Sequence, residues 1–191
     1  MMNSTSPFFE RIKLHGKPVA NPDSIIVHGQ ARFTLLTPRL IRLEWATNSQ
    51  FEDRSTFAFP SRFADAPTFD CESIAGGIEI TSQYLTLRYV PDGKPFNSTN
   101  LSISFTLGEK VINWTRGLPN EENLRGTRRT LDQCVDVASI PEGLLSRDGW
   151  SLFDDSASVV WNLEQTWVEG RPNEHICDWY FSVMVTITRH S

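Results

Sequence analysis

Short stretches in which apolar and polar residues alternate, separated by turn residues, constrain the fold of this chain most strongly. In the segment LIRLEW, Ile41, Leu43 and Trp45 fall on one side of an extended chain, and Arg42 and Glu44 fall on the other. A period of two residues is that of a β-strand with different environments on its two faces. The segment therefore predicts a strand with one apolar and one polar face.

The same pattern recurs along most of the chain. It predicts strands over residues 24–29, 31–36, 40–45, 78–80, 84–90, 101–107, 111–114 and 150–153. Residues 60–69 are predicted as a loop, and no stretch longer than about ten residues has the 3.6-residue apolar period of a helix. Many short strands separated by turns favour an all-β antiparallel sandwich or barrel with little helix. The alternation further predicts that one face of each sheet meets water.

Composition excludes several classes of function. The 191 residues suffice for one domain with a core, and the formal charge of −5 comes from scattered acids. Binding to nucleic acid or to an anionic membrane surface would require a basic face on the protein. The sequence predicts no such face, so neither partner is expected. No apolar run approaches ~20 residues, so no membrane span is expected. The four histidines lack ligand spacing, and we expect no metal and no cofactor.

Cysteine usage and the N-terminus bear on localisation. Cys71, Cys134 and Cys177 are odd in number and widely spaced, which favours reduced thiols over a disulfide framework. The N-terminus has no basic region followed by a long apolar core, so no signal peptide is visible. Both observations predict a cytoplasmic protein. Residues 1–24 are polar and contain three prolines, which predicts an N-terminal arm with a short strand over residues 8–14.

The segment PEGLLSRDGWSLFDDS, residues 141–156, combines two turns with carboxylates, Arg147 and Trp150. One interpretation is a β-hairpin whose Asp side chains hold turns by accepting hydrogen bonds from nearby backbone N–H groups. Another is a sugar-contacting edge, because carboxylates, guanidinium groups and indoles are the groups that polyhydroxyl ligands require. Acids flank Arg147 on both sides, so a charge-assisted network at this position is expected.

GLLSRDGWSLFDDS also resembles the segment that closes the N-terminal β-sandwich of family-31 glycoside hydrolases, the α-glucosidase and α-xylosidase family. Four other segments resemble that family in the same order: the turn TPR followed by LIRLEW, then FEDRST, NLRGTRRTLD and DWYF. The resemblance implies that residues 25–181 form a galactose-mutarotase-like antiparallel β-sandwich.

The resemblance also implies site residues. The loop over residues 123–132 lies, in that family, near the mouth of the catalytic barrel, which makes Arg128, Thr130 and Asp132 candidate substrate-binding residues. The alternative is a solvated loop whose arginines pair with surplus acid. No catalytic residue is expected, because the family's catalytic carboxylates lie on a barrel of ~250 residues that this chain lacks. Asp154 and Asp155 are adjacent on a strand and would point to opposite faces.

The function expected from the resemblance is that of a non-catalytic domain of an α-glycosidase. Such a domain would pack on the catalytic barrel and shape the substrate entrance, with an α-glucoside or α-xyloside as the carbohydrate partner. Two alternatives stay open. One is a stand-alone carbohydrate-binding β-sandwich, and the other is a non-functional truncated product.

Residues 182–191 depart from the family, which continues after Tyr-Phe with a segment of the type Leu-Gly-Tyr-Gly-His-Asp-Tyr. The sequence FSVMVTIT can be encoded as UUC UCG GUU AUG GUC ACG AUU ACC. In a frame displaced by one base, that message reads Leu-Gly-Tyr-Gly-His-Asp-Tyr. We therefore expect residues 182–191 to be an out-of-frame tail.

Sequencing of the transcript across codon 181 tests this expectation. The expected result is a displaced frame that continues with Leu-Gly-Tyr-Gly-His-Asp-Tyr and then encodes a barrel. An intact frame with no barrel encoded downstream would contradict it.

Overall fold

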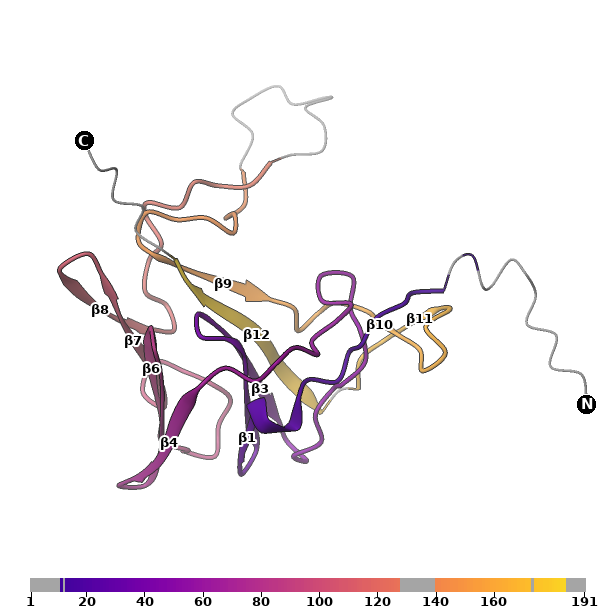
Figure 1. Cartoon of the computed structure of the whole chain (residues 1–191), viewed down its shortest axis with the longest axis horizontal. Coiled ribbons are helices and arrows are strands. Elements are labelled where there is room, and N and C mark those ends of the chain that lie inside the picture. The colour runs from indigo at the N-terminus through magenta and orange to yellow at the C-terminus, as the bar shows by residue number, and fades with distance from the viewer. Residues whose placement is uncertain (1–10, 12, 128–139, 173, 185–191) are drawn as a thin grey trace, which may run out of the picture. The chain divides into compact units, whose positions relative to one another are not determined.

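The structure is a computed structural model that describes residues 11, 13–127, 140–172 and 174–184 (Figure 1). Its strands form two five-stranded sheets, in the orders β1-β2-β3-β12-β9 and β4-β5-β6-β7-β8, and a two-stranded ribbon of β10 and β11. A 3-10 helix, η1, spans Pro22–Ser24. The strands are β1 (Ile25–His28), β2 (Ala31–Thr37), β3 (Leu40–Ala46), β4 (Phe69–Ile74), β5 (Gly77–Ser82), β6 (Leu85–Tyr89), β7 (Leu101–Leu107), β8 (Lys110–Thr115), β9 (Trp150–Asp154), β10 (Val160–Trp161), β11 (Val168–Glu169) and β12 (His175–Val183).

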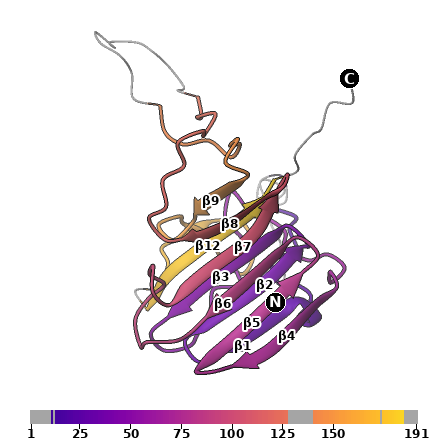
Figure 2. The ribbon, with the colours of Figure 1, turned by 90° about the vertical axis from the view of Figure 1, so that its left-hand side faces the viewer.

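The structure confirms the expected fold class, an all-β antiparallel sandwich with little helix. Strand β1 pairs with β2 in antiparallel fashion, and so do all neighbours in the sheet from β4 to β8. Figure 2 shows β6, β7 and β8 as neighbouring strands of that sheet. Each of the eight strands predicted from alternation has a counterpart within two residues of its predicted ends.

Strand β4 was not predicted: only its first residue, Phe69, lay in the predicted loop, and residues 70–74 were assigned to no element. It pairs only with β5, at the edge of its sheet, and most of its residues are exposed. An edge strand that buries neither face selects no alternating pattern, so its sequence carries little strand signal. In the turn that joins β4 to β5, Gly76 adopts a φ of 79°.

The chain divides into two compact units, which are described separately. The first unit comprises Met1–Thr37, Ile41–Pro67 and Asp154–Trp179. In it, Phe33, Leu35, Ile41 and Leu43 are buried on β2 and β3. The described part of the arm is also hydrogen-bonded here, since Leu14 N–H donates to the carbonyl oxygen of Gln165 at 2.9 Å. The predicted strand over residues 8–14 lies largely outside the described residues, and residues 13 and 14 are not part of a strand.

The prediction of a water-facing polar face is wrong for β3. Arg42 is 2% exposed and Glu44 0% exposed, so both faces of this strand are buried. Charged side chains tolerate burial only when each is paired and hydrogen-bonded. The polar residues of β3 are therefore buried together with charged partners, which the next subsection describes.

The second unit comprises Pro38–Leu40, Thr68–Phe153 and Tyr180–Ser191. Alternation in β7 follows the prediction here, with Leu101, Ile103 and Phe105 buried and the intervening serines partly exposed. Its core contains an aromatic cluster centred on Phe181. The ring of Phe181 lies 4.8 Å from Trp114, 6.1 Å from Trp150 and 6.2 Å from Phe105, between centroids.

Of the aromatic side chains in this cluster, Phe181 is the one whose truncation should reduce the stability of the fold most. Phe181→Ala leaves a cavity among three aromatic side chains, so we expect the free energy of unfolding to fall by about 3–5 kcal/mol. Urea unfolding followed by tryptophan fluorescence measures the change. Val111→Ala on β8, where the side chain is exposed, is the control and should have little effect. Equal effects of the two substitutions would contradict the role assigned to the cluster.

Candidate functional site

A network of buried arginines and carboxylates occupies the first unit, and its centre is the pair Arg42–Asp178. Nε and one terminal nitrogen of Arg42 on β3 donate to the two carboxylate oxygens of Asp178 on β12, at 2.7 and 2.8 Å. Arg171 approaches the same carboxylate at 2.8 Å and reaches Asp155 at 3.2 Å. Asp155 also accepts a hydrogen bond from the hydroxyl of Thr56 at 2.8 Å. Four segments distant in sequence are joined by these contacts.

The charge state of Asp178 follows from this geometry. Burial by itself would raise the pKa of Asp178, because it removes water from the carboxylate. The charges of Arg42 and Arg171, with the hydrogen bonds from Arg42, outweigh burial and hold that pKa well below its usual range. Asp178 is therefore ionised at neutral pH, as an anchor between two guanidinium groups, which is the opposite of what a general acid requires.

A second group of charges extends the network along β2 and β3. Arg32 donates to both oxygens of Glu44, at 2.6 and 2.9 Å, and lies 2.7 Å from Asp53. Arg42 connects this group to the Arg42–Asp178 pair, because it also lies 3.1 Å from Glu44. Burial opposes the charge of Arg32, but Glu44 and Asp53 more than compensate and raise the pKa of Arg32 above its ordinary value.

The segment FEDRST forms the edge of the network. The backbone carbonyl of Glu52 accepts a hydrogen bond from Arg42 at 2.8 Å, and its side chain accepts two from Arg54 at 2.8 and 2.7 Å. Arg54 also lies 2.6 Å from Glu169 on β11. Burial would raise the pKa of Glu52, but its hydrogen bonds with Arg54 lower it overall. The neighbours Asp53 and Arg54 have different ionic partners, Arg32 for Asp53 and the two glutamates for Arg54.

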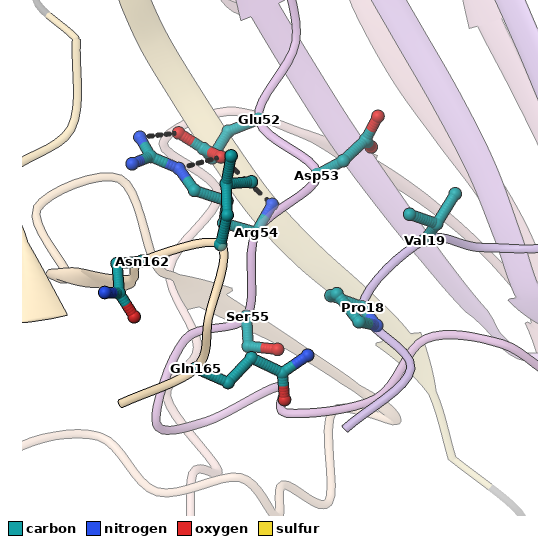
Figure 3. A pocket seen from close by; sticks show the side chains of 9 residues that line it. Pro18, Val19, Glu52, Asp53, Arg54, Ser55, Asn162 and Gln165 are labelled. Atoms are coloured by element: carbon teal, nitrogen blue, oxygen red, sulfur yellow. Dashed lines mark hydrogen bonds and ion pairs between the residues drawn. The ribbon is translucent and has the colours of Figure 1, made fainter. Parts of the chain in front are cut away.

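Beside this network lies a cavity of about 300 Å³ (Figure 3). The arm, the segment FEDRST and the loop between β10 and β11 build it together. Its lining residues are Pro18, Val19, Glu52, Asp53, Arg54, Ser55, Asn162, Leu163 and Gln165. Figure 3 shows the Glu52–Arg54 pair on one side, Pro18 and Val19 on another, and Asn162 and Gln165 from the hairpin loop.

The loop between β10 and β11 is held in place by its own amides. The side-chain oxygen of Asn162 accepts hydrogen bonds from the backbone N–H groups of Thr166 and Trp167, at 2.9 and 3.2 Å. The side chain of Gln165 both accepts from Gly16 N–H at 3.0 Å and donates to the Gly16 carbonyl at 3.1 Å. Arm and loop therefore form one fixed wall of the cavity.

The two carboxylates at the end of β9 diverge, as expected for adjacent residues on a strand. Asp155 is fully buried in the network, whereas Asp154 is exposed and accepts a hydrogen bond from Ser156 N–H at 3.0 Å. The turn-holding role predicted for the aspartates of this segment is thus observed at Asp154. The charge network expected around Arg147 is not observed, because its nearest acid is Glu122 at 3.9 Å and both side chains are exposed.

The candidate substrate-binding residues Arg128, Thr130 and Asp132 lie outside the described residues. The stem of their loop, in the second unit, is described. The side-chain oxygen of Asn123 accepts hydrogen bonds from the N–H groups of Arg125 and Gly143, both at 2.8 Å, and Asn123 bridges to Ser146. Two of the segments that resemble the glycosidase family therefore lie side by side.

Sequence reasoning did not single out four members of the network. Arg32, Glu52, Arg171 and Glu169 were not singled out, because an isolated arginine or glutamate in a strand or loop has the same appearance whether it is exposed or paired. The available signal was the placement of Arg42 and Glu44 within an otherwise apolar strand. That signal does not identify their partners.

In comparisons with known proteins, the chain matches no protein-family model and no curated protein. Within the described residues, no group of three or more His, Cys, Asp or Glu side chains could hold a metal ion. In that same part of the chain, no helix has the length and apolar character needed to cross a membrane. The site's chemistry must therefore be argued from its own side chains.

Asp178→Asn should expose the dependence of the first unit on this network. The substitution leaves Arg42 and Arg171 buried without their shared counter-charge, and we expect the free energy of unfolding to fall by about 3–5 kcal/mol. Because the pKa of Asp178 is lower in the folded state, its stabilising effect is present above the unfolded pKa of about 3.9. It is lost as the pH falls toward the folded pKa.

Urea unfolding between pH 7 and acid measures both effects. The variant should lack part of the acid-induced loss of stability that the parent chain shows. Asp154→Asn removes the same charge at an exposed position and serves as the matched control. If both variants retained the parental pH profile, the assignment of Asp178 as a buried charged anchor would be wrong.

Proposed function

We propose that residues 25–181 are the non-catalytic N-terminal domain of a family-31 α-glycosidase, with a galactose-mutarotase-like β-sandwich. In this proposal the domain packs on a catalytic barrel and shapes the substrate entrance for an α-glucoside or α-xyloside. The all-β fold class is compatible with it. The five segments that carry the resemblance also support it, because contacts within each unit connect them.

Within the first unit, four of those segments meet in the buried network. LIRLEW supplies Arg42, FEDRST supplies Glu52 and Thr56, and DWYF supplies Asp178. The network also contains Asp155 from the segment closing the sandwich. Loss of one partner of a buried ion pair is strongly destabilising, so residue types in such a network are constrained together. The shared residues are therefore understood as structural rather than catalytic.

A single observation carries the proposal that this domain docks on a partner. Leu144 and Leu145, inside the segment with the strongest resemblance, are 65% and 63% exposed. In the same unit Leu124, within the candidate substrate-binding loop, and Ile140, beyond its end, are also exposed. An exposed group of large aliphatic side chains marks an interaction surface, and a barrel domain would remove it from water.

Expression of two products tests this proposal. The chain by itself should not hydrolyse a chromogenic α-glucoside or α-xyloside, because the family's two catalytic carboxyl groups lie on the barrel and not on the domain that these residues resemble. The product of the displaced frame after codon 181 should hydrolyse one of them. Turnover by the chain alone that Asp154→Asn abolished would overturn the proposal.

A paired substitution tests the docking surface. Leu144→Asp with Leu145→Asp should leave the isolated chain folded but abolish or strongly reduce hydrolysis by the displaced-frame product, because charge is placed in the proposed domain contact. Val111→Asp, at an equally exposed position on β8, is the matched control. Full activity of the double variant would remove the support that Leu144 and Leu145 provide.

Stand-alone carbohydrate binding is the second candidate, and one observation favours it. Trp167, next to β11, is 69% exposed, and an exposed indole is a common platform for the apolar face of a sugar ring. A glycan-binding screen of the isolated chain distinguishes this candidate from the first. A chain that folds but neither binds glycans nor contributes to hydrolysis in the displaced-frame product would be the non-functional truncated product.

A further inference from the structure

The cavity beside the buried network combines apolar walls with charges that are already neutralised. Pro18, Val19 and Leu163 supply apolar surface from the arm and the hairpin loop. Of the charged lining residues, Arg54 is paired with Glu52 and Glu169, at 2.7 and 2.6 Å. A bound anion would compete with two carboxylates for this guanidinium. The cavity is therefore unsuited to phosphate or to an acidic ligand.

Cations are disfavoured for the corresponding reason. Asp53 lies 2.7 Å from Arg32, and both oxygens of Glu52 accept hydrogen bonds from Arg54. A cationic ligand would displace an arginine that is itself largely buried. The electrostatics of the cavity thus favour a neutral ligand.

Unused hydrogen-bond capacity distinguishes a polar neutral ligand from a hydrocarbon. A guanidinium group has five N–H donors, and Arg54 uses three of them through Nε and its two terminal nitrogens. The side-chain amides of Asn162 and Gln165 each use one of their two N–H donors, on Thr166 and Gly16 respectively. Asp53, half-exposed, adds acceptor capacity at the rim. Donors and acceptors therefore surround an apolar surface.

We propose that this cavity binds a neutral polyhydroxyl ligand the size of one sugar ring. The volume of about 300 Å³ lies at the lower end of small-molecule sites. The ring's apolar face would contact Val19, Pro18 and Leu163, while its hydroxyl groups would accept from Arg54, Asn162 and Gln165 and donate to Asp53. The proposal deepens the carbohydrate-binding candidate and is independent of docking on a barrel.

Two-dimensional NMR of the isotopically labelled full chain tests the site directly, with D-glucose, D-xylose and maltose as probes. The side-chain amide signals of Asn162 and Gln165 should shift on titration, with a Kd on the order of 1 mM for so small a ligand. Inorganic phosphate and putrescine are the charged comparison probes and should produce no such shift.

Val19→Trp supplies a variant that fills the cavity. Val19 is 53% exposed, so the larger side chain can extend over the cavity without entering the core. We expect sugar binding to weaken about tenfold or more. Val27→Trp, at a 57% exposed position on β1 that does not line the cavity, is the matched control and should bind as the parent does. Thermal unfolding of both variants establishes that each remains folded.

The possible outcomes separate the proposals. Sugar binding that is lost in Val19→Trp and retained in Val27→Trp supports the site. Sugar binding that persists in Val19→Trp overturns the site but leaves carbohydrate binding elsewhere on the chain intact. Absence of sugar binding overturns both the site and stand-alone carbohydrate binding. Stronger shifts with phosphate or putrescine than with sugars overturn the site alone. None of these results bears on docking to a barrel.

Discussion

The ion pair between Arg42 and Asp178 is the interaction on which the first unit depends. The two residues are 136 positions apart, and both side chains are almost completely buried. Each is stable in that position only because the other neutralises it and occupies its hydrogen-bonding groups. The pair therefore specifies how the end of the described chain meets a strand formed near its beginning, with Arg171 and Asp155 as secondary anchors.

This dependence gives a physical meaning to segments that resemble a glycosidase family. Their charged residues could be taken for catalytic groups, since catalysis also uses carboxylates with perturbed pKa values. In this chain the perturbation is of the opposite kind from that of a general acid, because two guanidinium groups hold Asp178 ionised. The charges serve the architecture, and the proposed docking function rests instead on the exposed Leu144 and Leu145.

The same pairing shapes the adjacent cavity. Because Arg54 and Asp53 already have ionic partners, the polar groups in the largely apolar cavity wall carry little net charge. A wall of this kind can distinguish ligands by hydroxyl geometry and apolar shape rather than by charge. The structural network and the proposed sugar site are thus consequences of one arrangement of side chains.

The sequence by itself determined the strands whose faces differ. Alternation in LIRLEW and in residues 101–107 depends on local chain geometry, so β3 and β7 could be predicted from their residues alone. Strand β4 could not, because an exposed edge imposes no pattern. Tertiary structure alone decided that Arg42 and Glu44 are buried and that the arm and hairpin loop enclose a cavity. Periodicity is a property of neighbouring residues, whereas the stability of a buried charge depends on partners that only the folded chain brings near.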